Sequence, residues 1–277
     1  EEKVALVHAN SKFTIPGIER LGIPELTMSD GPHGIREELE RDSWKPANLT
    51  DDSSSYLPNG ICLASTWNTD LAYEFGKVLG AEARHRDKDI LLAPGVNIMR
   101  TPVCGRNFEY FGEDPFLVSR MAVNYINGVQ SQGVGACVKH YFANNQEHLR
   151  NSINVEMSDR VMHEIYLPAF KAAVKEANVM AVMGAYNKFR GQYCSHNKLL
   201  NNKILKNDWD FEGVVISDWN ATQNTSEAIK NGLDIEMGTH ATSYNEYYLA
   251  APFLELLKNG SVEQHYLDDK VRRILRT

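Results

Sequence analysis

Short apolar runs separated by amphipathic stretches are the feature that most restricts the fold of this 277-residue sequence. The run Val214-Val215-Ile216 has no polar side chain, as expected for a strand buried on both faces of a parallel sheet. Periodicity alone does not separate such runs from buried helix, but their length and flanking glycines favour strands. The sequence therefore predicts strands over residues 25–29, 60–64, 89–93, 136–139, 179–184, 213–217 and 233–237.

Helices with recognisable starts lie between these runs. Asn68 precedes apolar residues at helical spacing, and Asp114 is an N-cap residue followed by a proline. Ser158 opens a third helix, in which Pro168 predicts a kink. Residues 261–264 have the pattern of a capping box, which predicts the start of the last helix.

The alternation of strands and helices predicts an α/β fold with a parallel sheet. We expect residues 1–277 to form one (β/α)8-like TIM barrel domain, since such barrels run to about 250 residues. Residues 37–58 have the composition of a polar loop, so the barrel is expected to be irregular near its first strand-helix unit. A doubly wound open sheet is the alternative, but its usual GxGxxG turn does not occur.

Charge and composition exclude several classes of partner. The net charge is −7, from 29 Lys plus Arg against 36 Asp plus Glu, which disfavours nucleic acid. No apolar stretch approaches the roughly 18 residues of a membrane span. The four cysteines are far apart and the histidines are scattered, so we expect buried thiols, no metal site and no cofactor. The sequence opens at Glu1 without a methionine, so we expect further residues before it and assign no cellular compartment.

Polar side chains follow the ends of the predicted strands. Asp30 follows the first strand, Lys139-His140 ends the fourth, and Asp218-Trp219 follows the sixth. Because functional side chains of parallel α/β folds lie beyond the C-terminal strand ends, these residues are expected to share one cleft. Carboxylates beside aromatic side chains favour carbohydrate chemistry, in which a carboxylate attacks the anomeric carbon.

Each of these residues also has a purely structural interpretation. Asp218 is equally suited to capping a helix, and Asp30 precedes a Gly-Pro turn of the kind in which aspartate is common. The remaining structural alternatives are a surface pair or a core histidine for Lys139 and His140, core packing for Met183, and an ion pair with Glu109 for Arg106.

Several ordered blocks of the sequence resemble glycoside hydrolase family 3, in its β-glucosidase branch. The blocks are residues 29–36 (SDGPHGIR), 91–98 (LLAPGVNI), 105–109 (GRNFE), 113–115 (EDP), 139–141 (KHY) and 214–219 (VVISDW). The similarity extends from the first residue to the last. The resemblance implies a retaining β-glycosidase that removes terminal β-D-glucosyl residues and has a barrel lacking the usual helix near its start.

The resemblance also assigns roles to particular residues. Asp218 is expected to be the catalytic nucleophile. The residues expected to bind sugar hydroxyls in the −1 subsite are Asp30, Arg36, Arg106, Lys139 and His140, and those expected to line it are Met183, Tyr186 and Trp219.

Two departures refine this expectation. The N-acetylglucosaminidase branch carries Gly-His-Gly shortly after its Lys-His pair, whereas residues 142–147 here are FANNQE. In β-glucosidase-type members the acid/base glutamate lies on a second α/β sandwich domain, so we expect it from outside this chain and not from Glu109, Glu147 or Glu236. The alternatives are a β-xylosidase or arabinofuranosidase, and a sugar-binding barrel that is inactive on its own.

Overall fold

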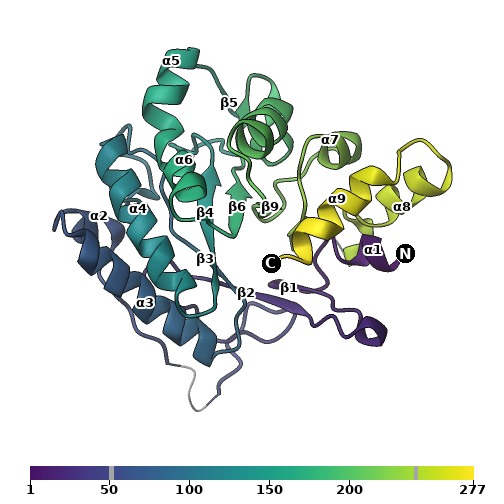
Figure 1. The fold of residues 1–277 in the computed structure, drawn as a ribbon, viewed down its shortest axis with the longest axis horizontal. Coiled ribbons are helices and arrows are strands. Elements are labelled where there is room, and N and C mark those ends of the chain that lie inside the picture. The colour runs from purple at the N-terminus through teal and green to yellow at the C-terminus, as the bar shows by residue number, and fades with distance from the viewer. Residues whose placement is uncertain (50–52, 240–242) are drawn as a thin grey trace.

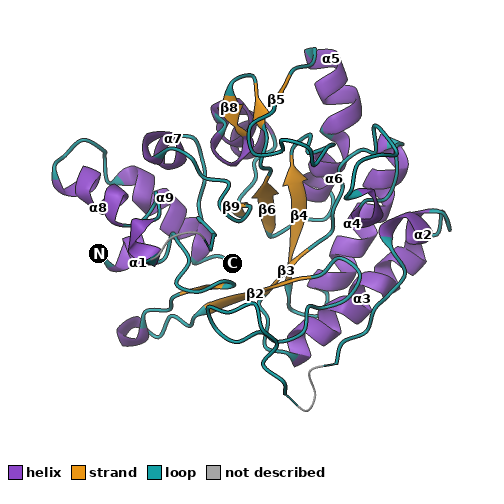
Figure 2. Cartoon of the chain, turned by 180° about the vertical axis from the view of Figure 1, so that it is seen from behind, coloured by secondary structure: helices purple, strands orange, loops and turns teal. Residues whose placement is uncertain are grey.

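A computed structural model describes residues 1–49, 53–239 and 243–277. The chain forms an α/β fold in which a curled, mixed sheet is flanked by helices (Figures 1 and 2). The sheet has the order β1-β2-β3-β4-β6-β9; β1 and β2 are antiparallel and the other neighbours are parallel. Its strands are β1 (Thr14–Ile15), β2 (Leu26–Asp30), β3 (Ile90–Leu92), β4 (Gly135–Tyr141), β6 (Ala181–Gly184) and β9 (Val214–Ser217).

The remaining elements surround this sheet. A small sheet contains β5 (Asn154–Val155), β7 (Lys188–Phe189) and β8 (Gln192–Tyr193). The α-helices are α1 (Glu2–Ala5), α2 (Gly60–Ala64), α3 (Thr69–His85), α4 (Pro115–Gln130), α5 (Asp159–Val161), α6 (Pro168–Lys175), α7 (Thr225–Lys230), α8 (Ala251–Lys258) and α9 (His265–Ile274). A π-helical turn, Met162–Tyr166, separates α5 from α6, and an eleven-residue π-helix spans Lys198–Asp208.

Two predicted strands are wrong. Residues 60–64 form helix α2, because the Asn59 side chain accepts a hydrogen bond from the Cys62 N–H and so caps a helix. Residues 233–237 form no strand; they make only isolated bridges, Ile216 to Ile235 and His8 to Glu236. Strand pairing there is limited to single residues, although the run is apolar and buried. The other five predictions overlap observed strands of the large sheet.

Three of the four predicted helix starts are confirmed. The side chains of Asn68, Asp114 and Ser158 accept hydrogen bonds from N–H groups in the first turns of α3, α4 and α5. The helix opened by Ser158 is interrupted just before Pro168, where the expected kink falls. The capping box at 261–264 is wrong, since α9 begins at His265 without a side-chain cap.

Helices α3 and α4 pack closely because glycines lie at their contact. A Cβ at Gly76 would lie 2.1 Å from the Tyr125 carbonyl oxygen, and one at Gly128 would lie 2.1 Å from that of Tyr73. Such contacts leave no room for a side chain at either of these two positions. The two backbones therefore approach more closely than ordinary side chains would allow.

The two ends of the described chain meet beside β9. The Ala9 N–H donates to the Glu236 carbonyl at 2.9 Å, and the Glu236 N–H donates to that of Val7 at 3.0 Å. Nearby, Lys3 forms an ion pair with Asp268 of α9 at 2.6 Å. In the described part of residues 37–58 there is no helix or strand, as expected. Among the described residues, no helix has the length and apolar character needed to cross a membrane.

Candidate active site

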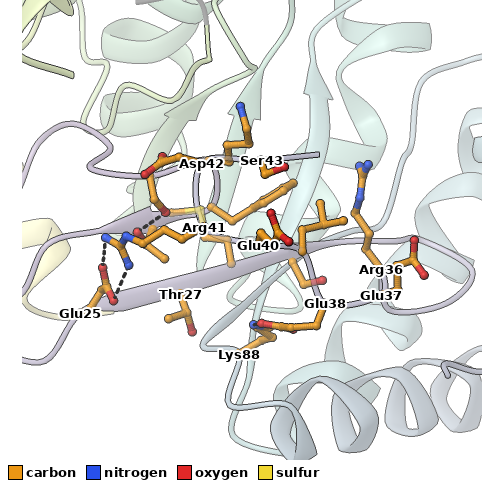
Figure 3. A pocket seen from close by; sticks show the side chains of 17 residues that line it. Glu25, Thr27, Arg36, Glu37, Glu38, Glu40, Arg41, Asp42, Ser43 and Lys88 are labelled. Carbon is orange, nitrogen blue, oxygen red and sulfur yellow. Dashed lines mark hydrogen bonds and ion pairs between the residues drawn. The ribbon is translucent and has the colours of Figure 1, made fainter. Parts of the chain in front are cut away.

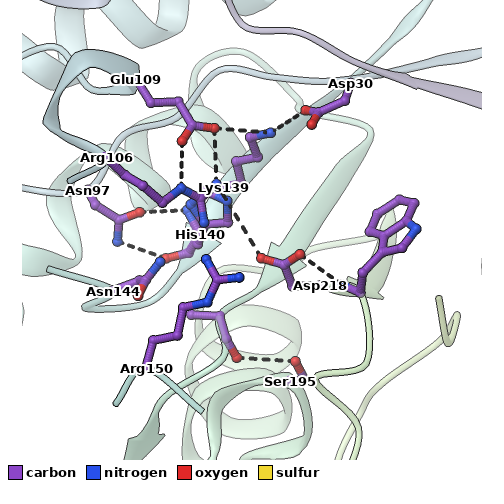
Figure 4. A network of polar contacts seen from close by, with 12 residues as sticks. Asp30, Asn97, Arg106, Glu109, Lys139, His140, Asn144, Arg150, Ser195 and Asp218 are labelled. Atoms are coloured by element: carbon purple, nitrogen blue, oxygen red, sulfur yellow. Dashed lines mark hydrogen bonds and ion pairs between the residues drawn. The ribbon is translucent and has the colours of Figure 1, made fainter. Parts of the chain in front are cut away.

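A cavity of about 570 Å³ opens beyond the C-terminal ends of β2, β4, β6 and β9. All nine side chains that the sequence singled out line it: Asp30, Arg36, Arg106, Lys139, His140, Met183, Tyr186, Asp218 and Trp219. Residues separated by up to 189 positions are thus brought together, and Figure 4 shows the polar contacts among several of them.

Asp218 lies directly after β9, and its two carboxylate oxygens differ. Oδ1 accepts a hydrogen bond from the Trp219 N–H at 2.8 Å, whereas Oδ2 is buried without a well-aligned partner among the described residues. Burial raises the pKa of Asp218, although the positive charges of Arg106 and Lys139 oppose that rise. The next helix, α7, is capped by Asn224, so Asp218 is not a helix cap. The carboxylate lines the cavity, where it also interacts with the Tyr186 hydroxyl.

Lys139 joins two carboxylates at the base of the cavity. Its Nζ lies 2.7 Å from Asp30 Oδ1 and 3.3 Å from Glu109 Oε1, and its side chain is only 3% exposed. Burial favours the neutral amine, but the two carboxylates outweigh it and raise the pKa of Lys139. Burial also opposes ionisation of Asp30, yet attraction to Lys139 lowers the pKa of this carboxyl group. All three groups are therefore charged at neutral pH.

Arg106 holds the histidine of the cavity in one protonation state. It donates to Glu109 through two nitrogens, at 2.8 and 3.1 Å, and its Nη2 lies 2.7 Å from His140 Nε2. Because a guanidinium only donates, Nε2 accepts and the ring proton lies on Nδ1, which faces the Tyr110 hydroxyl at 3.2 Å. Burial, followed by repulsion from Arg106 and Lys139, lowers the pKa of His140 well below its usual value.

The backbone of His140 is fixed by one amide side chain. Asn97 Oδ1 accepts from the His140 N–H at 2.7 Å, and its Nδ2 donates to the His140 carbonyl at 2.9 Å. His140 Nε2 lies 3.7 Å from Asp218 Oδ2, but a neutral ring with its lone pair toward Arg106 forms no ion pair there. His140 thus lies beside the Asp218 carboxylate as a neutral ring and does not neutralise its charge.

Aromatic side chains form the opposite wall. The Trp219 Nε1–H donates to the Lys12 carbonyl at 2.9 Å, and its ring lies 5.2 Å from that of Phe13. The Arg36 guanidinium lies 4.9 Å from the Trp44 ring centre. These contacts place apolar ring faces next to hydrogen-bonding groups, an arrangement suited to sugars.

Several lining or supporting residues were not assigned to the site from the sequence. Arg150 lies 4.2 Å from the Tyr186 ring centre and points toward Asp218 (Figure 4). Trp44 belongs to the polar loop, whose position relative to the cavity cannot be read from periodicity. Glu109 and Asn97 stood in recognised blocks, which were the available signal in the sequence, and the structure buries both side chains.

A second cavity of about 240 Å³ is lined in part by the segment 36–43 (Figure 3). Two of its acidic side chains are paired: Glu25 lies 2.8 Å from Arg41, and Glu38 lies 2.8 Å from Lys88. These ion pairs tie the segment to the residue before β2 and to the residues before β3. The two ion pairs thus help to hold the loop that carries Arg36. No cluster of three potential metal ligands occurs in residues 1–49, 53–239 and 243–277.

Comparison with known proteins agrees with this geometry. The family "Glycosyl hydrolase family 3 N terminal domain" matches residues 17–277. A β-glucosidase of Bacteroides ovatus is 52% identical over 100% of this chain and 38% of its own length. An exo-α-(1→6)-L-arabinopyranosidase of Bifidobacterium breve is 38% identical over 86% of this chain and 31% of its own.

Solved structures show the same likeness. β-Glucosidase 3B from Thermotoga neapolitana in complex with glucose superposes with a TM-score of 0.92 and is 40% identical. The match covers 99% of this chain and 40% of that protein. The chain thus spans less than half the length of these relatives. Residues 17–277 carry the family pattern, and the chain belongs to glycosyl hydrolase family 3, whose N-terminal domain it matches.

Proposed function

We propose that this chain is the nucleophile-bearing domain of a retaining β-glycosidase of the β-glucosidase type. The observation that carries the proposal is Asp218 Oδ2, a buried carboxylate oxygen without a well-aligned partner in a cavity lined by cations and aromatic rings. Relatives named as β-glucosidases support glucose as the terminal sugar.

In this proposal a terminal β-D-glucosyl ring occupies the cavity with its anomeric carbon facing Asp218. Oδ2 attacks that carbon, the bond to the leaving oxygen breaks, and a covalent glycosyl-enzyme forms. Asp30 and Lys139 bind sugar hydroxyls, together with Arg36, Arg106 and His140. Met183, Tyr186 and Trp219 contact the ring. Water then releases the sugar with net retention of configuration.

Retention needs a second carboxyl group, about 5–5.5 Å from the nucleophile, to protonate the leaving oxygen and later activate water. Among the described residues, the carboxylates lining the cavity are Asp218 itself and Asp30. Asp30 is paired with Lys139 and has a lowered pKa, so it is a poor proton donor at neutral pH. We therefore assign the acid/base to a second α/β sandwich domain or to another chain.

The barrel architecture is also part of this proposal. The isolated bridges at Ile235 and Glu236 continue the parallel order beyond β9 and reach His8, which precedes β1. A sheet that returns toward its first strand supports a (β/α)8-like barrel that is irregular after β2.

Covalent labelling tests the nucleophile without the missing acid. We expect 2,4-dinitrophenyl 2-deoxy-2-fluoro-β-D-glucoside to add one fluoroglucosyl group to Asp218, because its leaving group needs little protonation. Peptide mass spectrometry locates the adduct, and glucose should slow its formation. Asp218→Asn should remain folded and unlabelled, whereas labelling of any other residue, or none in folded protein, would contradict the proposal.

The arabinopyranosidase relative favours a second candidate, a glycosidase for pentosides, which includes β-xylosidase and arabinofuranosidase activities. Rates on nitrophenyl glucoside, xyloside and arabinosides, measured with the acid-bearing domain present, distinguish the two. A sugar-binding domain without turnover would show glucose binding by calorimetry, with no labelling and no hydrolysis of any of these substrates.

A further inference from the structure

The cavity has a buried floor and an exposed rim. Lys139, His140 and Met183 are at most 2% exposed, and Asp218 is 7% exposed. Gln223 and Trp44, which also line the cavity, are exposed. A terminal sugar that reaches the buried floor leaves its next ring at the rim. The rim residues therefore meet the leaving group.

Gln223 stands at the far end of the loop that begins at the nucleophile. Its Nε2 donates to the Asn220 carbonyl at 2.9 Å, and its amide oxygen accepts no hydrogen bond from a described residue. An unused carbonyl oxygen at the rim is suited to accept a hydrogen bond from a sugar hydroxyl.

The backbone of Gln223 is held by a buried histidine. Its N–H donates to His196 Nε2 at 3.1 Å, and His196 has no exposed surface. Because a backbone N–H only donates, Nε2 carries no proton and the ring proton lies on Nδ1. His196 Nδ1 lies 2.9 Å from Glu227 Oε2, although the contact is not ideally aligned for a hydrogen bond.

Glu227 and His196 are themselves anchored. Gln192 donates to Glu227 Oε1 at 3.1 Å, and Asn231 donates to the His196 carbonyl at 3.2 Å. Burial lowers the pKa of His196, while Glu227 opposes that effect, so the ring stays neutral and able to accept at neutral pH. The loop that follows Asp218 is thus held at Gln223 by His196 and Glu227, which do not line the cavity.

We propose that Gln223 contacts the second sugar ring of the substrate, and that His196, held by Glu227, is the positioning residue that sets Gln223 at the rim. This inference rests on the proposed function, because it assumes that the terminal ring binds beside Asp218. The ligand class is a β-linked glucosyl disaccharide or a longer oligosaccharide with the same end.

A competition experiment isolates the second ring. The rate of Asp218 labelling by the fluoroglucoside is measured against glucose and against an S-linked β-glucosyl disaccharide, whose sulfur bridge resists hydrolysis. Gln223→Ala should weaken protection by the disaccharide about five- to tenfold, the effect of one lost hydrogen bond, and leave protection by glucose within twofold. Gln264→Ala, at the position just before α9, is the matched control and should change neither.

Variants of the buried pair test the positioning role. His196→Leu removes the acceptor and should weaken protection by the disaccharide but not by glucose. His196→Gln restores an acceptor and should recover at least half of the lost disaccharide protection. If His196→Leu does not fold, Glu227→Gln, altered at a partly exposed side chain, tests the same link and should weaken disaccharide protection about two- to fivefold.

The outcomes separate this inference from the proposed function. Equal loss of glucose and disaccharide protection in the His196 variants would show a general structural role and overturn the positioning role. Unchanged disaccharide protection in Gln223→Ala would overturn the contact itself. Absence of labelling in the unaltered protein would instead remove the proposed function.

Discussion

The guanidinium of Arg106 lies 2.7 Å from His140 Nε2 and makes this histidine a neutral acceptor beside Asp218. The same guanidinium is a nearby positive charge that opposes the burial of Asp218. Arg106 therefore controls two groups at once: it holds the ring proton of His140 on Nδ1, and it favours the ionised form of Asp218, the form that the proposed attack requires.

Removing the charge of Arg106 should make the nucleophile harder to ionise. Burial raises the pKa of Asp218, and Arg106→Gln removes the largest opposing charge, so the pKa should rise further. The labelling rate requires the carboxylate and falls as pH drops through this pKa; its acidic limb should therefore move to higher pH. The pH profile of labelling measures this, with Arg272→Gln as a distant control. A limb that stays in place would contradict the role of Arg106.

Arg150 should contribute to sugar binding, although the sequence did not reveal it. Arg150→Met keeps an unbranched side chain over Tyr186 but removes the guanidinium that points into the cavity. We expect glucose protection against labelling to weaken about tenfold, as for a lost hydrogen bond to a charged group. Arg160→Met, on the exposed side of α5, should leave protection unchanged. Equal protection in both variants would exclude Arg150 from the sugar site.

Glu236 should make stability depend on pH. It is 4% exposed, and burial raises its pKa to about 7, while the Leu249 N–H donates to it at 2.7 Å. When the pKa of a carboxyl group is higher in the folded than in the unfolded protein, the protonated group stabilises the fold. This contribution is fully present below the unfolded-state pKa and is lost as pH rises through the folded-state pKa. The free energy of unfolding should thus fall between about pH 4.5 and 7 by an amount on the order of 1–3 kcal/mol.

Urea unfolding at several pH values checks this dependence. Glu236→Gln keeps an oxygen that accepts from Leu249 but does not ionise, so its unfolding free energy should change less over this window and exceed that of the unaltered protein at pH 8. Glu255→Gln, at an exposed site on α8, should retain the original dependence. A parallel fall in all three proteins would assign the dependence to other groups.

The glycine contacts between α3 and α4 predict a difference between two identical substitutions. Gly128→Ala places a methyl group where the Tyr73 carbonyl already lies and should lower the free energy of unfolding by about 1–3 kcal/mol. Gly112→Ala meets no atom within 4 Å and should change it by less than about 0.5 kcal/mol. Thermal or urea unfolding measures both, and equal effects would mean that the helices separate freely.

The sequence predicted the α/β class and the gathering of polar strand ends, because strands that alternate with helices form a parallel sheet whose C-terminal ends share one edge. It misplaced the segment 60–64, where five apolar or small residues fit a strand and a helix equally well. The hydrogen bond from the Cys62 N–H to the Asn59 side chain caps a helix and so favours helix over strand. A single capping residue is harder to recognise in a sequence than a hydrophobic run. The isolated bridges at 235 and 236 show that a buried apolar run need not form a regular ladder.

Within the site, residues that continue a strand were easier to predict than residues from loops. Asp218, Lys139 and His140 follow directly from β9 or lie in β4, so their direction is set by the sheet. Arg150 and Trp44 come from loops, whose course depends on contacts distant in sequence, such as Arg150 with Tyr186. Such contacts have no local periodicity from which to infer them.

The pairing of residues 7–9 with residue 236 also determines when this part of the fold can close. This contact closes a loop of more than two hundred residues, and contacts of such long sequence separation form slowly because the intervening chain must first be ordered. A chain emerging from a ribosome cannot make it until residue 236 has been synthesised, well after Asp218. Until then residues 7–9 lack their hydrogen-bond partner, and this side of the fold stays unpaired.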